Sequence, residues 1–474
     1  MTTDQIAGLD NSQMQQTEYG SVGRKVLFVC YDFPPRRTSA VYRHVGIMKY
    51  LPVFGWKPTI LTILPESTDV QDQGLMEGLD PRIEIVRTSR NDITRWESKA
   101  ERTIKASGGL APAKSSGDEP LRDRVIRRTG AFIRSLIYFP DDTVGWTLPG
   151  LRAAVRLHRE TSFDVVYTSS PPRSAPLIGL GLKLLFGIPW VAEFRDPWYP
   201  PKRPLRRRFE RMLQKFILRK ADAIVLISDG LAAELQNSFG IPAAKLHVVP
   251  NGYDESEFAE DANPVSIFDG SKFNISHFGT VYKGLCGKFF QALKEVVEDN
   301  PLYRQQVRIN IIGFPEDPEL AAWSRSPELG EMIKFHPFMP QKDALKAMQA
   351  SDCLLLFLGS SAMSRLSGLG KIYWYLRVGR PILAIAPEGG TKDLVQQAHA
   401  GWVAAPEDTE TMKRVLREVI SAGHQPVPAH PIDPDFVEQF RYDRLSARLA
   451  EVLKRVSDRP YGTKVTASSR QSPI

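Results

Sequence analysis

The chain of 474 residues is 42% hydrophobic and 24% charged, which is typical of globular proteins and excludes a collagen-like repeat or a disordered chain. The 62 Lys and Arg residues exceed the 54 Asp and Glu residues, which gives a formal net charge of +8. Such a surplus is typical of proteins that bind nucleic acid, an anionic membrane surface or a phosphorylated substrate. At roughly 100–200 residues per domain, the length predicts two domains.

The cysteines and the first residues indicate the compartment. Cys30, Cys286 and Cys353 lie far apart and show neither a Cys-x-x-Cys pair nor a ligand spacing with histidine. We therefore expect buried free thiols rather than disulfides or a structural zinc site. Residues 1–23 are polar and lack the apolar core of a secretory signal, so we expect a cytoplasmic protein. The longest apolar stretch falls short of the roughly 20 residues that cross a bilayer.

Short runs rich in β-branched residues alternate with helical patterns, which is typical of βαβ units and predicts parallel sheets. In the first half the expected strands are Lys25–Tyr31, Pro58–Ile63, Ile83–Ser89, Asp164–Ser170, Trp190–Arg195, Ala223–Ser228 and His247–Asn251. In the second half they are Phe273–Gly279, Val307–Gly313, Ile333–Phe338, Cys353–Leu358, Pro381–Ala386 and Gly401–Ala405. Several of these runs are apolar throughout, which suits strands that are covered on both faces.

The polar stretch Asp254–Ser271 divides the two halves, so we expect an α/β protein of two Rossmann-like, doubly wound domains with a hinge near residue 260. The C-terminal helix, capped at Asp435, is expected to pack back on the first domain. The predicted order is a disordered tail at 1–23, an N-terminal domain at 24–260 with a flexible insertion at about 90–145, a C-terminal domain at 261–432, a helix at 433–456 and a disordered tail at 457–474.

Open parallel sheets bind ligands at the carboxyl ends of their strands, so the loops there are candidate sites. The first strand runs into Asp32–Arg43, which brings Asp32, Arg37 and Arg43 to one edge together with hydroxyl groups and a helix start. This combination suits an anion. The alternative is that Asp32 caps the helix and the arginines are solvated.

A second group of charged residues ends a later strand of the first domain. Glu193, Arg195 and Asp196 follow one another closely at that strand end. An acid–base–acid cluster can orient a sugar hydroxyl, or it can be an internal ion pair that fixes the loop. Both interpretations stay open from the sequence.

The second domain offers two lysines beside glycine-containing turns. Gly279, Thr280 and Lys283 follow the first strand of this domain, while Gly370 and Lys371 open a helix. Free backbone N–H groups and positive charge converge in such places, which suits a pyrophosphate.

Several familiar motifs are missing. There is no G-x-G-x-x-G after the first strand, no G-x-x-x-x-G-K-[ST], no G-x-S-x-G and no pair of histidines with metal-ligand spacing. Gly179 and Gly181 lie inside a helical pattern, where close packing explains them better than a nucleotide loop. A nicotinamide-dependent dehydrogenase is therefore disfavoured.

An ordered series of short segments resembles the family 4-like glycosyltransferases. The segments that resemble the first domain of that family are Tyr31–Pro35, Lys49–Trp56, Phe194–Trp198, Ala221–Ser228 and Val249–Asp254, and Lys371–Leu383 resembles the donor-site helix of its second domain. The resemblance covers roughly residues 25–455 and implies a GT-B fold, in which two Rossmann-like domains face a central cleft.

The resemblance also implies a hexosyltransferase activity that retains the anomeric configuration and needs no cofactor and no metal. The nucleotide-sugar donor is then a substrate held at Gly279, Thr280, Lys283, Gly370, Lys371 and Trp374. Lys283 and Lys371 would meet the charge of the departing diphosphate, with Asp196 as a third candidate catalytic residue. The acceptor, a glycan or a lipid-linked sugar of polysaccharide biosynthesis, would lie beside Asp32, Arg37, Arg43, Glu193 and Arg195. No nucleic-acid partner is expected.

One departure from the family pattern matters. The family usually carries two glutamates with seven residues between them, and here Leu366 and Trp374 take their places. Either aromatic stacking replaces the usual ribose contact, or the protein is a GT-B relative that binds a nucleotide-sugar or a partner without transfer. A nucleotide-sugar epimerase is a further alternative.

The charge surplus is concentrated in one segment. Residues 202–220 hold nine Lys and Arg but only one acid, Glu210, which accounts for the whole net charge. On a helical wheel, an apolar arc faces away from the basic residues: Leu205, Phe209, Met212, Leu213, Phe216 and Ile217. The helix either packs this arc on the sheet, or it docks on anionic lipid through Arg207, Arg208 and Arg211, together with 122–134. The second interpretation predicts a peripheral protein on the inner face of the cytoplasmic membrane.

Overall fold

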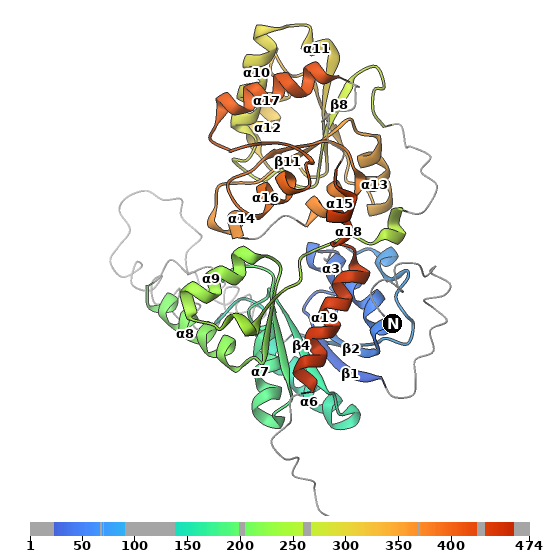
Figure 1. Ribbon diagram of the computed structural model, residues 1–474, viewed down its shortest axis with the longest axis vertical. Coiled ribbons are helices and arrows are strands. Elements are labelled where there is room, and N and C mark those ends of the chain that lie inside the picture. Colours follow the sequence, from blue (N-terminus) through green and yellow to red (C-terminus); the bar gives the residue numbers. More distant parts are fainter. Residues whose placement is uncertain are drawn as a thin grey trace, which may run out of the picture.

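The computed structural model describes residues 23–66, 69, 71–90, 138–198, 204–258, 267–366, 370–423 and 432–458. Two α/β domains lie one above the other, and each contains a parallel sheet with helices on both faces (Figure 1). The expected tails, most of the expected insertion and the basic segment 122–134 lie outside the described residues.

The N-terminal domain has a seven-stranded parallel sheet with the order β3-β2-β1-β4-β5-β6-β7. Its strands are β1 (Arg24–Val29), β2 (Trp56–Ile63), β3 (Glu84–Thr88), β4 (Val165–Ser170), β5 (Trp190–Phe194), β6 (Ala223–Leu226) and β7 (Leu246–Val248). The order reverses at β1, which is the mark of a doubly wound sheet and places loops of the two halves side by side at the carboxyl edge.

The C-terminal domain has a six-stranded parallel sheet with the order β10-β9-β8-β11-β12-β13. Its strands are β8 (Phe273–Phe278), β9 (Val307–Ile312), β10 (Ile333–His336), β11 (Cys353–Phe357), β12 (Ile382–Ile385) and β13 (Gly401–Ala404). Every strand expected from the sequence is present in the two sheets, and the strand ends differ by at most three residues. The expected α/β fold of two doubly wound domains is therefore confirmed.

Helices cover both faces of each sheet (Figure 1). Those of the first domain are α3 (Ser39–Tyr50), α6 (Thr147–Thr161), α7 (Ala175–Phe186), α8 (Pro204–Lys220) and α9 (Asp229–Phe239), with short 3-10 turns η1 (Leu51–Phe54), η2 (Gln73–Met76), η3 (Val144–Trp146), η4 (Ala243–Lys245) and η5 (Glu255–Phe258). The helices that follow are α10 (Gly287–Asp299), α11 (Tyr303–Gln306), α12 (Pro318–Trp323), α13 (Gln341–Ala350), α14 (Ala362–Leu366), α15 (Lys371–Val378), α16 (Gly390–Gln397), α17 (Thr409–Ala422), α18 (Pro434–Glu438) and α19 (Tyr442–Ser457).

The end of the chain returns to the first domain. Where the sequence predicted one helix capped at Asp435, the structure has α18 and α19, and the cap of α18 is Asp433, whose side chain accepts hydrogen bonds from the backbone N–H of Asp435. The α19 helix packs along α3, where the ring of Tyr442 leaves no room for a side chain at Gly46. The last helix among the described residues therefore belongs to the core of the first domain.

The three cysteines are buried and free, as the sequence predicted. Among the described residues, no helix is both long enough and apolar enough to cross a membrane.

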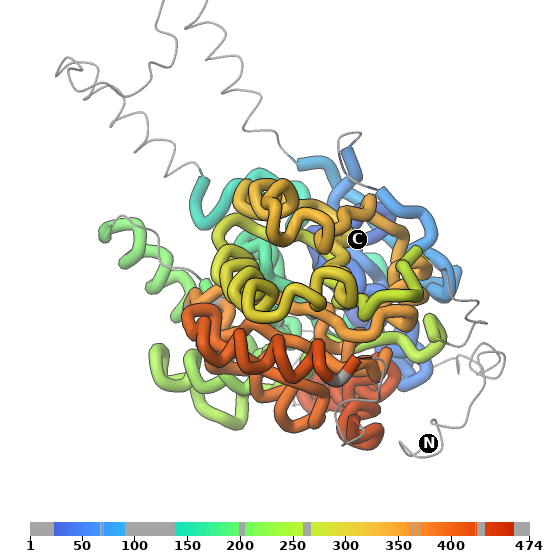
Figure 2. The backbone as a smooth tube through the Cα atoms, turned by 90° about the horizontal axis from the view of Figure 1, so that it is seen from above, coloured from blue at the N-terminus to red at the C-terminus, as the bar shows by residue number. Residues whose placement is uncertain are grey.

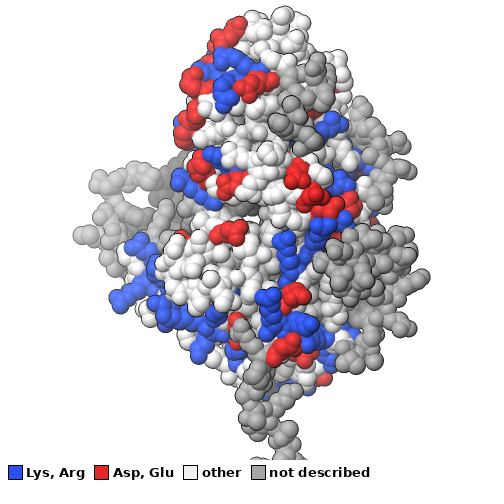
Figure 3. Space-filling view, viewed as in Figure 1, with Lys and Arg blue, Asp and Glu red and all other residues white. Residues whose placement is uncertain are grey.

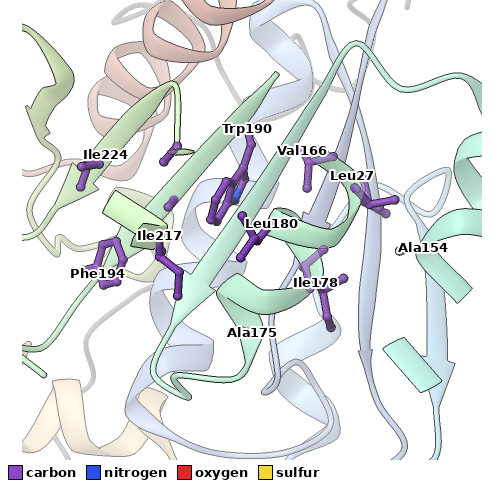
Figure 4. Close-up of a cluster of buried hydrophobic side chains, with 14 of the residues drawn as sticks. Leu27, Ala154, Val166, Ala175, Ile178, Leu180, Trp190, Phe194, Ile217 and Ile224 are labelled. Carbon is purple, nitrogen blue, oxygen red and sulfur yellow. The ribbon is translucent and has the colours of Figure 1, made fainter. Parts of the chain in front are cut away.

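Close packing in the first domain depends on a glycine of α7. The α7 helix lies on the sheet beside Trp190, which is fully buried and donates a hydrogen bond to Thr168 at 2.9 Å (Figure 4). A Cβ atom at Gly179 would lie only 2.3 Å from Nε1 of Trp190 and 2.6 Å from Cγ2 of Thr168. Gly179 thus serves packing, as the sequence predicted, and not nucleotide binding.

We expect Gly179→Ala to lower the free energy of unfolding by about 1–3 kcal/mol, because the added methyl group overpacks the contact with Trp190. Urea denaturation followed by tryptophan fluorescence measures the change. Gly390→Ala is the matched control, since a Cβ atom there meets open space at the start of α16. Equal stability of the two variants would contradict the packing role of Gly179.

Candidate active site

The two domains meet through side chains at the carboxyl ends of both sheets. The guanidinium group of Arg37 lies 3.7 Å from the ring centroid of Phe338, which belongs to the second domain. The ring of Tyr42 meets Trp374 edge-on with 5.3 Å between centroids. On the other side of the interface, the hydroxyl group of Ser228 donates a hydrogen bond to the carbonyl of Leu366, where α9 faces α14 (Figure 1).

Lys371 is the buried amine of this region. It is the first residue of α15, and its Nζ donates a hydrogen bond to the carbonyl of Phe278 at 2.7 Å and lies 3.3 Å from Nε2 of His277. Burial lowers the pKa of Lys371 to about 7. Burial and the neighbouring Lys371 likewise hold the pKa of His277 well below its usual range. None of the described residues places a carboxylate in contact with Lys371, so an anionic ligand would find an amine that is ready to take up a proton.

Two glycines with left-handed backbone conformations lie at the strand ends near Lys371. Gly279 follows β8 with a φ of 107°, and a Cβ atom there would lie 3.4 Å from Nζ of Lys371. At the end of β9, Gly313 has a φ of 128°, and a side chain there would clash with the carbonyl of Gly279 at 2.7 Å. Both positions require a backbone conformation that favours glycine, and Gly313 also requires a closeness that no Cβ atom tolerates. The structure thus brings Gly279, Gly370 and Lys371 into one region, although 367–369 lie outside the described residues.

The other residues expected at the donor side differ in exposure. Lys283 is exposed and makes no hydrogen bond or ion pair with any described residue, so its amine is available to a ligand. Thr280 is half-buried in the same loop. Trp374 is half-buried against Tyr42 of the other domain and is not an open stacking surface. The position where the resembling family carries a glutamate therefore holds a contact between domains.

Two residues that were expected beside the acceptor lie in the interior of the first domain. Arg43 and Glu193 form an ion pair of 2.7 Å, and their side chains are 2% and 0% exposed. Burial alone would raise the pKa of Glu193, but Arg43 and Arg195 lower it to about 2. Arg43 also donates to the carbonyl of Val249 at 2.8 Å. The pair joins α3, β5 and the segment after β7, and it cannot contact an acceptor directly. This corrects the expectation for these two residues.

Arg195 and Asp32 are held by their own neighbours. Arg195 donates to the hydroxyl group of Ser169 at 3.0 Å and to the carbonyl of Pro171 at 2.7 Å, which fixes the loop after β4. Asp32 pairs with Arg36 at 2.8 Å, and burial raises the pKa of Asp32. Of the five residues expected at the acceptor side, only Arg37 therefore reaches the other domain through a contact that the structure gives.

Sequence reasoning missed one member of this network. The imidazole of His44 lies 2.9 Å from the carbonyl of Asp32 and 3.0 Å from the hydroxyl group of Ser169, and it is fully buried. Burial, assisted by Arg195, lowers the pKa of His44 to about 3, so this ring is neutral. His44 and Ser169 lie 125 residues apart, and no local pattern could have paired them.

Asp196 lies elsewhere. It lines a cleft of about 640 Å³ between the end of β5, α8 and α9, together with Trp198, Arg207, Arg208 and Arg211. Burial raises the pKa of Asp196, against the influence of Arg195. No ion pair joins Asp196 to Lys283 or Lys371 within the described part of the chain. The joint catalytic role expected for Asp196, Lys283 and Lys371 therefore stays a prediction.

Comparisons with known proteins agree with this architecture. Residues 108–252 match the glycosyl transferase 4-like domain, and residues 287–428 match the glycosyl transferases group 1 domain. No curated protein matches the sequence.

The fold is similar to that of solved glycosyltransferase structures. HepE of Anabaena in complex with UDP and glucose is 16% identical, with 91% of this chain and 100% of that chain covered and a TM-score of 0.59. Sucrose-phosphate synthase of Thermosynechococcus elongatus is 13% identical (91% and 99% covered, TM-score 0.55), and the lipopolysaccharide outer core galactosyltransferase WaaB is 14% identical (91% and 99% covered, TM-score 0.54).

We expect Arg43→Met to lower the free energy of unfolding by about 3–5 kcal/mol, because Glu193 would remain as a buried charge without its partner. Denaturant unfolding at neutral pH measures the loss. Arg43→Met/Glu193→Leu should recover part of it, since neither charge is then buried alone. Arg37→Met is the control and should cost about 1 kcal/mol or less, because the contact with the Phe338 ring and a long hydrogen bond of 3.3 Å to the hydroxyl group of Tyr42 are lost, but no buried charge is left without its partner. An Arg43→Met protein as stable as this control would refute the role of the pair.

Proposed function

Because the chain belongs to the glycosyl transferase 4-like and group 1 family of GT-B glycosyltransferases, we propose that it moves a hexose with retention from a nucleotide-sugar to a glycan or lipid-linked acceptor. The observation that carries the donor side of this proposal is the environment of Lys371. Its buried amine lies at the start of α15 beside strand ends whose backbone conformation favours glycine. A diphosphate at this place would meet the amine and free backbone N–H groups together.

The proposed step breaks the bond between the anomeric carbon and the diphosphate oxygen. The acceptor hydroxyl adds to that carbon on the same face, and the hydroxyl proton leaves with the diphosphate. Cations beside the departing diphosphate lower the barrier, because they stabilise the negative charge that develops on it, as an oxyanion hole does. Lys371 and the exposed Lys283 would supply that charge from the second domain. This chemistry asks for no metal and no cofactor.

The acceptor would approach from the first domain. Arg37 is the acceptor-side candidate that already faces the second domain, through the ring of Phe338. Arg43, Glu193 and Arg195 would act indirectly by holding the strand ends behind it. The complex of HepE with UDP and glucose supports a UDP-hexose as the first donor to test, and the outer core activity of WaaB supports a glycan acceptor. A lipid-linked acceptor would bring the enzyme to the inner face of the cytoplasmic membrane.

A second candidate function is favoured by Trp374. This side chain stands where the resembling family carries a glutamate and is already engaged by Tyr42. A GT-B relative that binds a nucleotide-sugar without transferring it would fit that replacement. Product formation separates the two functions, because only the enzyme consumes the donor when an acceptor is added. Conversion of the donor in the absence of any acceptor would instead indicate an epimerase.

A panel of UDP-, GDP-, dTDP- and ADP-sugars in a thermal-shift assay tests the donor side and identifies the nucleotide. We then expect Lys371→Ala to lower kcat/KM for transfer at least about hundredfold, since one preorganised cation is lost from the leaving group, with little change in unfolding temperature. Lys392→Ala on α16 is the control, because that lysine is bonded only to the exposed Glu388. Unchanged turnover in folded Lys371→Ala would refute the role of Lys371, and a panel without stabilisation would refute donor binding.

The lowered pKa of Lys371 makes donor binding depend on pH. At pH 8 an amine with a pKa of about 7 is largely neutral, whereas a bound diphosphate favours its charged form. We therefore expect nucleotide binding to take up part of a proton at pH 8 and to weaken as the pH rises above 7. Calorimetry in two buffers of different ionisation enthalpy measures the uptake. Lys371→Met should abolish the uptake, and an undiminished uptake in this variant would assign the proton to another group.

A further inference from the structure

The α8 helix presents a row of large apolar side chains to solvent. Leu205, Phe209, Met212 and Phe216 are 57%, 52%, 58% and 44% exposed. On the wheel of an α-helix these four residues span about 60° of the circumference, so they form one continuous row. The sequence left open that the apolar arc packs on the sheet. The structure corrects this possibility, because only Ile217 of that arc is fully buried and Leu213 is half-buried.

Polar residues occupy much of the inward face of α8. Ile217 points into the hydrophobic core (Figure 4), but Glu210 and Gln214 are buried beside it. Glu210 accepts hydrogen bonds from Arg173 at 2.6 Å and from Arg206 at 2.8 Å. The pair with Arg173, which lies outside the helix, fixes the rotation of α8 about its axis, and the apolar row is thereby turned outward.

Cations border the apolar row. Arg208, Lys215 and Arg219 follow one side of it, and Lys220 lies on the other side, 5.7 Å from the ring centroid of Phe216. Arg207, Arg208, Lys215 and Arg219 are exposed and make no ion pair with any described residue. Arg211, which the sequence grouped with Arg207 and Arg208, is instead bonded to the carbonyl of Ser238 at 2.8 Å and packs on the ring of Phe239.

Within the described part of the chain, the apolar row is exposed. Blue side chains gather along the edge of the first domain where α8 lies (Figure 3), and the stretch containing α8 forms the outer edge of the molecule when seen from above (Figure 2). The acid within the helix, Glu210, is buried and already paired, so it does not offset these charges.

We propose that this outward face of α8 docks the enzyme on an anionic lipid bilayer. Leu205, Phe209, Met212 and Phe216 enter the region below the headgroups, and Arg208, Lys215 and Arg219 bind lipid phosphates. An apolar row bordered by unpaired cations is complementary to the two layers of such a surface, acyl chains beneath and negative charge above. A nucleic acid would match the cations but not the row of leucine, methionine and phenylalanine side chains.

The docking site deepens the proposed function, because it names the surface from which a lipid-linked acceptor would reach the enzyme. The cleft that holds Asp196 is lined by Arg207 and Arg208 of the same helix. When α8 lies on the membrane, this cleft is set beside the lipid headgroups. The docking itself requires neither donor nor acceptor, so it can be tested apart from transfer.

Flotation of the full chain with vesicles tests the proposal. We expect binding to vesicles of phosphatidylcholine with phosphatidylglycerol, little binding to phosphatidylcholine alone, and a loss of binding as salt is added. Phe209→Ser/Phe216→Ser and Arg208→Glu/Lys215→Glu should each lower the partition coefficient at least about tenfold. Their unfolding temperature and their stabilisation by the nucleotide-sugar should stay unchanged, because these side chains lie outside the core and the donor region.

Matched controls come from other exposed positions. Leu148→Ser/Leu302→Ser removes two exposed leucines, and Arg152→Glu/Arg156→Glu reverses two exposed arginines of α6. We expect both control variants to bind vesicles like the unmodified chain. Equal losses in the controls, unchanged binding of the α8 variants, or no binding of the unmodified chain to anionic vesicles would each overturn the proposal. If the protein transfers sugar to soluble acceptors but binds no vesicle, the docking proposal is wrong while the proposed function stands.

Discussion

The buried ion pair between Arg43 and Glu193 is the constraint on which the first domain depends. It links α3 to β5, and through the carbonyl of Val249 it also holds the segment that leads into the second domain. A buried ion pair is favourable only when the remaining polar atoms of both groups also form hydrogen bonds. Here the hydroxyl group of Ser169 donates to Glu193, and His44 and Arg195 in turn contact that hydroxyl group. The strand ends that face the second domain are therefore held by contacts that involve no substrate.

The second domain uses the opposite arrangement around Lys371. Its amine has a carbonyl and a neutral imidazole as neighbours but no carboxylate. Desolvation therefore favours the neutral form, and a bound diphosphate would restore the charge. The buried arginine of the first domain is thus paired with a carboxylate, whereas the lysine of the second domain would gain its counter-charge from the proposed ligand.

Much of the fold could be predicted because its signals are local. Strands buried on both faces are continuous apolar runs, and Gly179 lies in a helical pattern that required a packing explanation. The site was less accessible to sequence reasoning. The partner of Arg43 lies 150 residues away, and the contact of Tyr42 with Trp374 joins two domains. Such pairs depend on topology, so the sequence identified the types of residue but could not tell that Glu193 is an interior partner.

The α8 helix shows why an apolar arc alone does not determine which face is buried. A wheel ranks faces by hydrophobicity, yet Glu210 has two arginines within reach, Arg173 from the loop before α7 and Arg206 from its own helix. Arg206 also donates to the carbonyls of Tyr138 and Pro140, so turning the row inward would break these two contacts and the contact of Glu210 with Arg173. Because an unpaired buried charge costs more than a few exposed apolar side chains, the ion pairs decide the orientation. Exposing the apolar row to water is unfavourable, and this free energy is regained only when another apolar surface covers the row. This is the physical argument for a bilayer at this face.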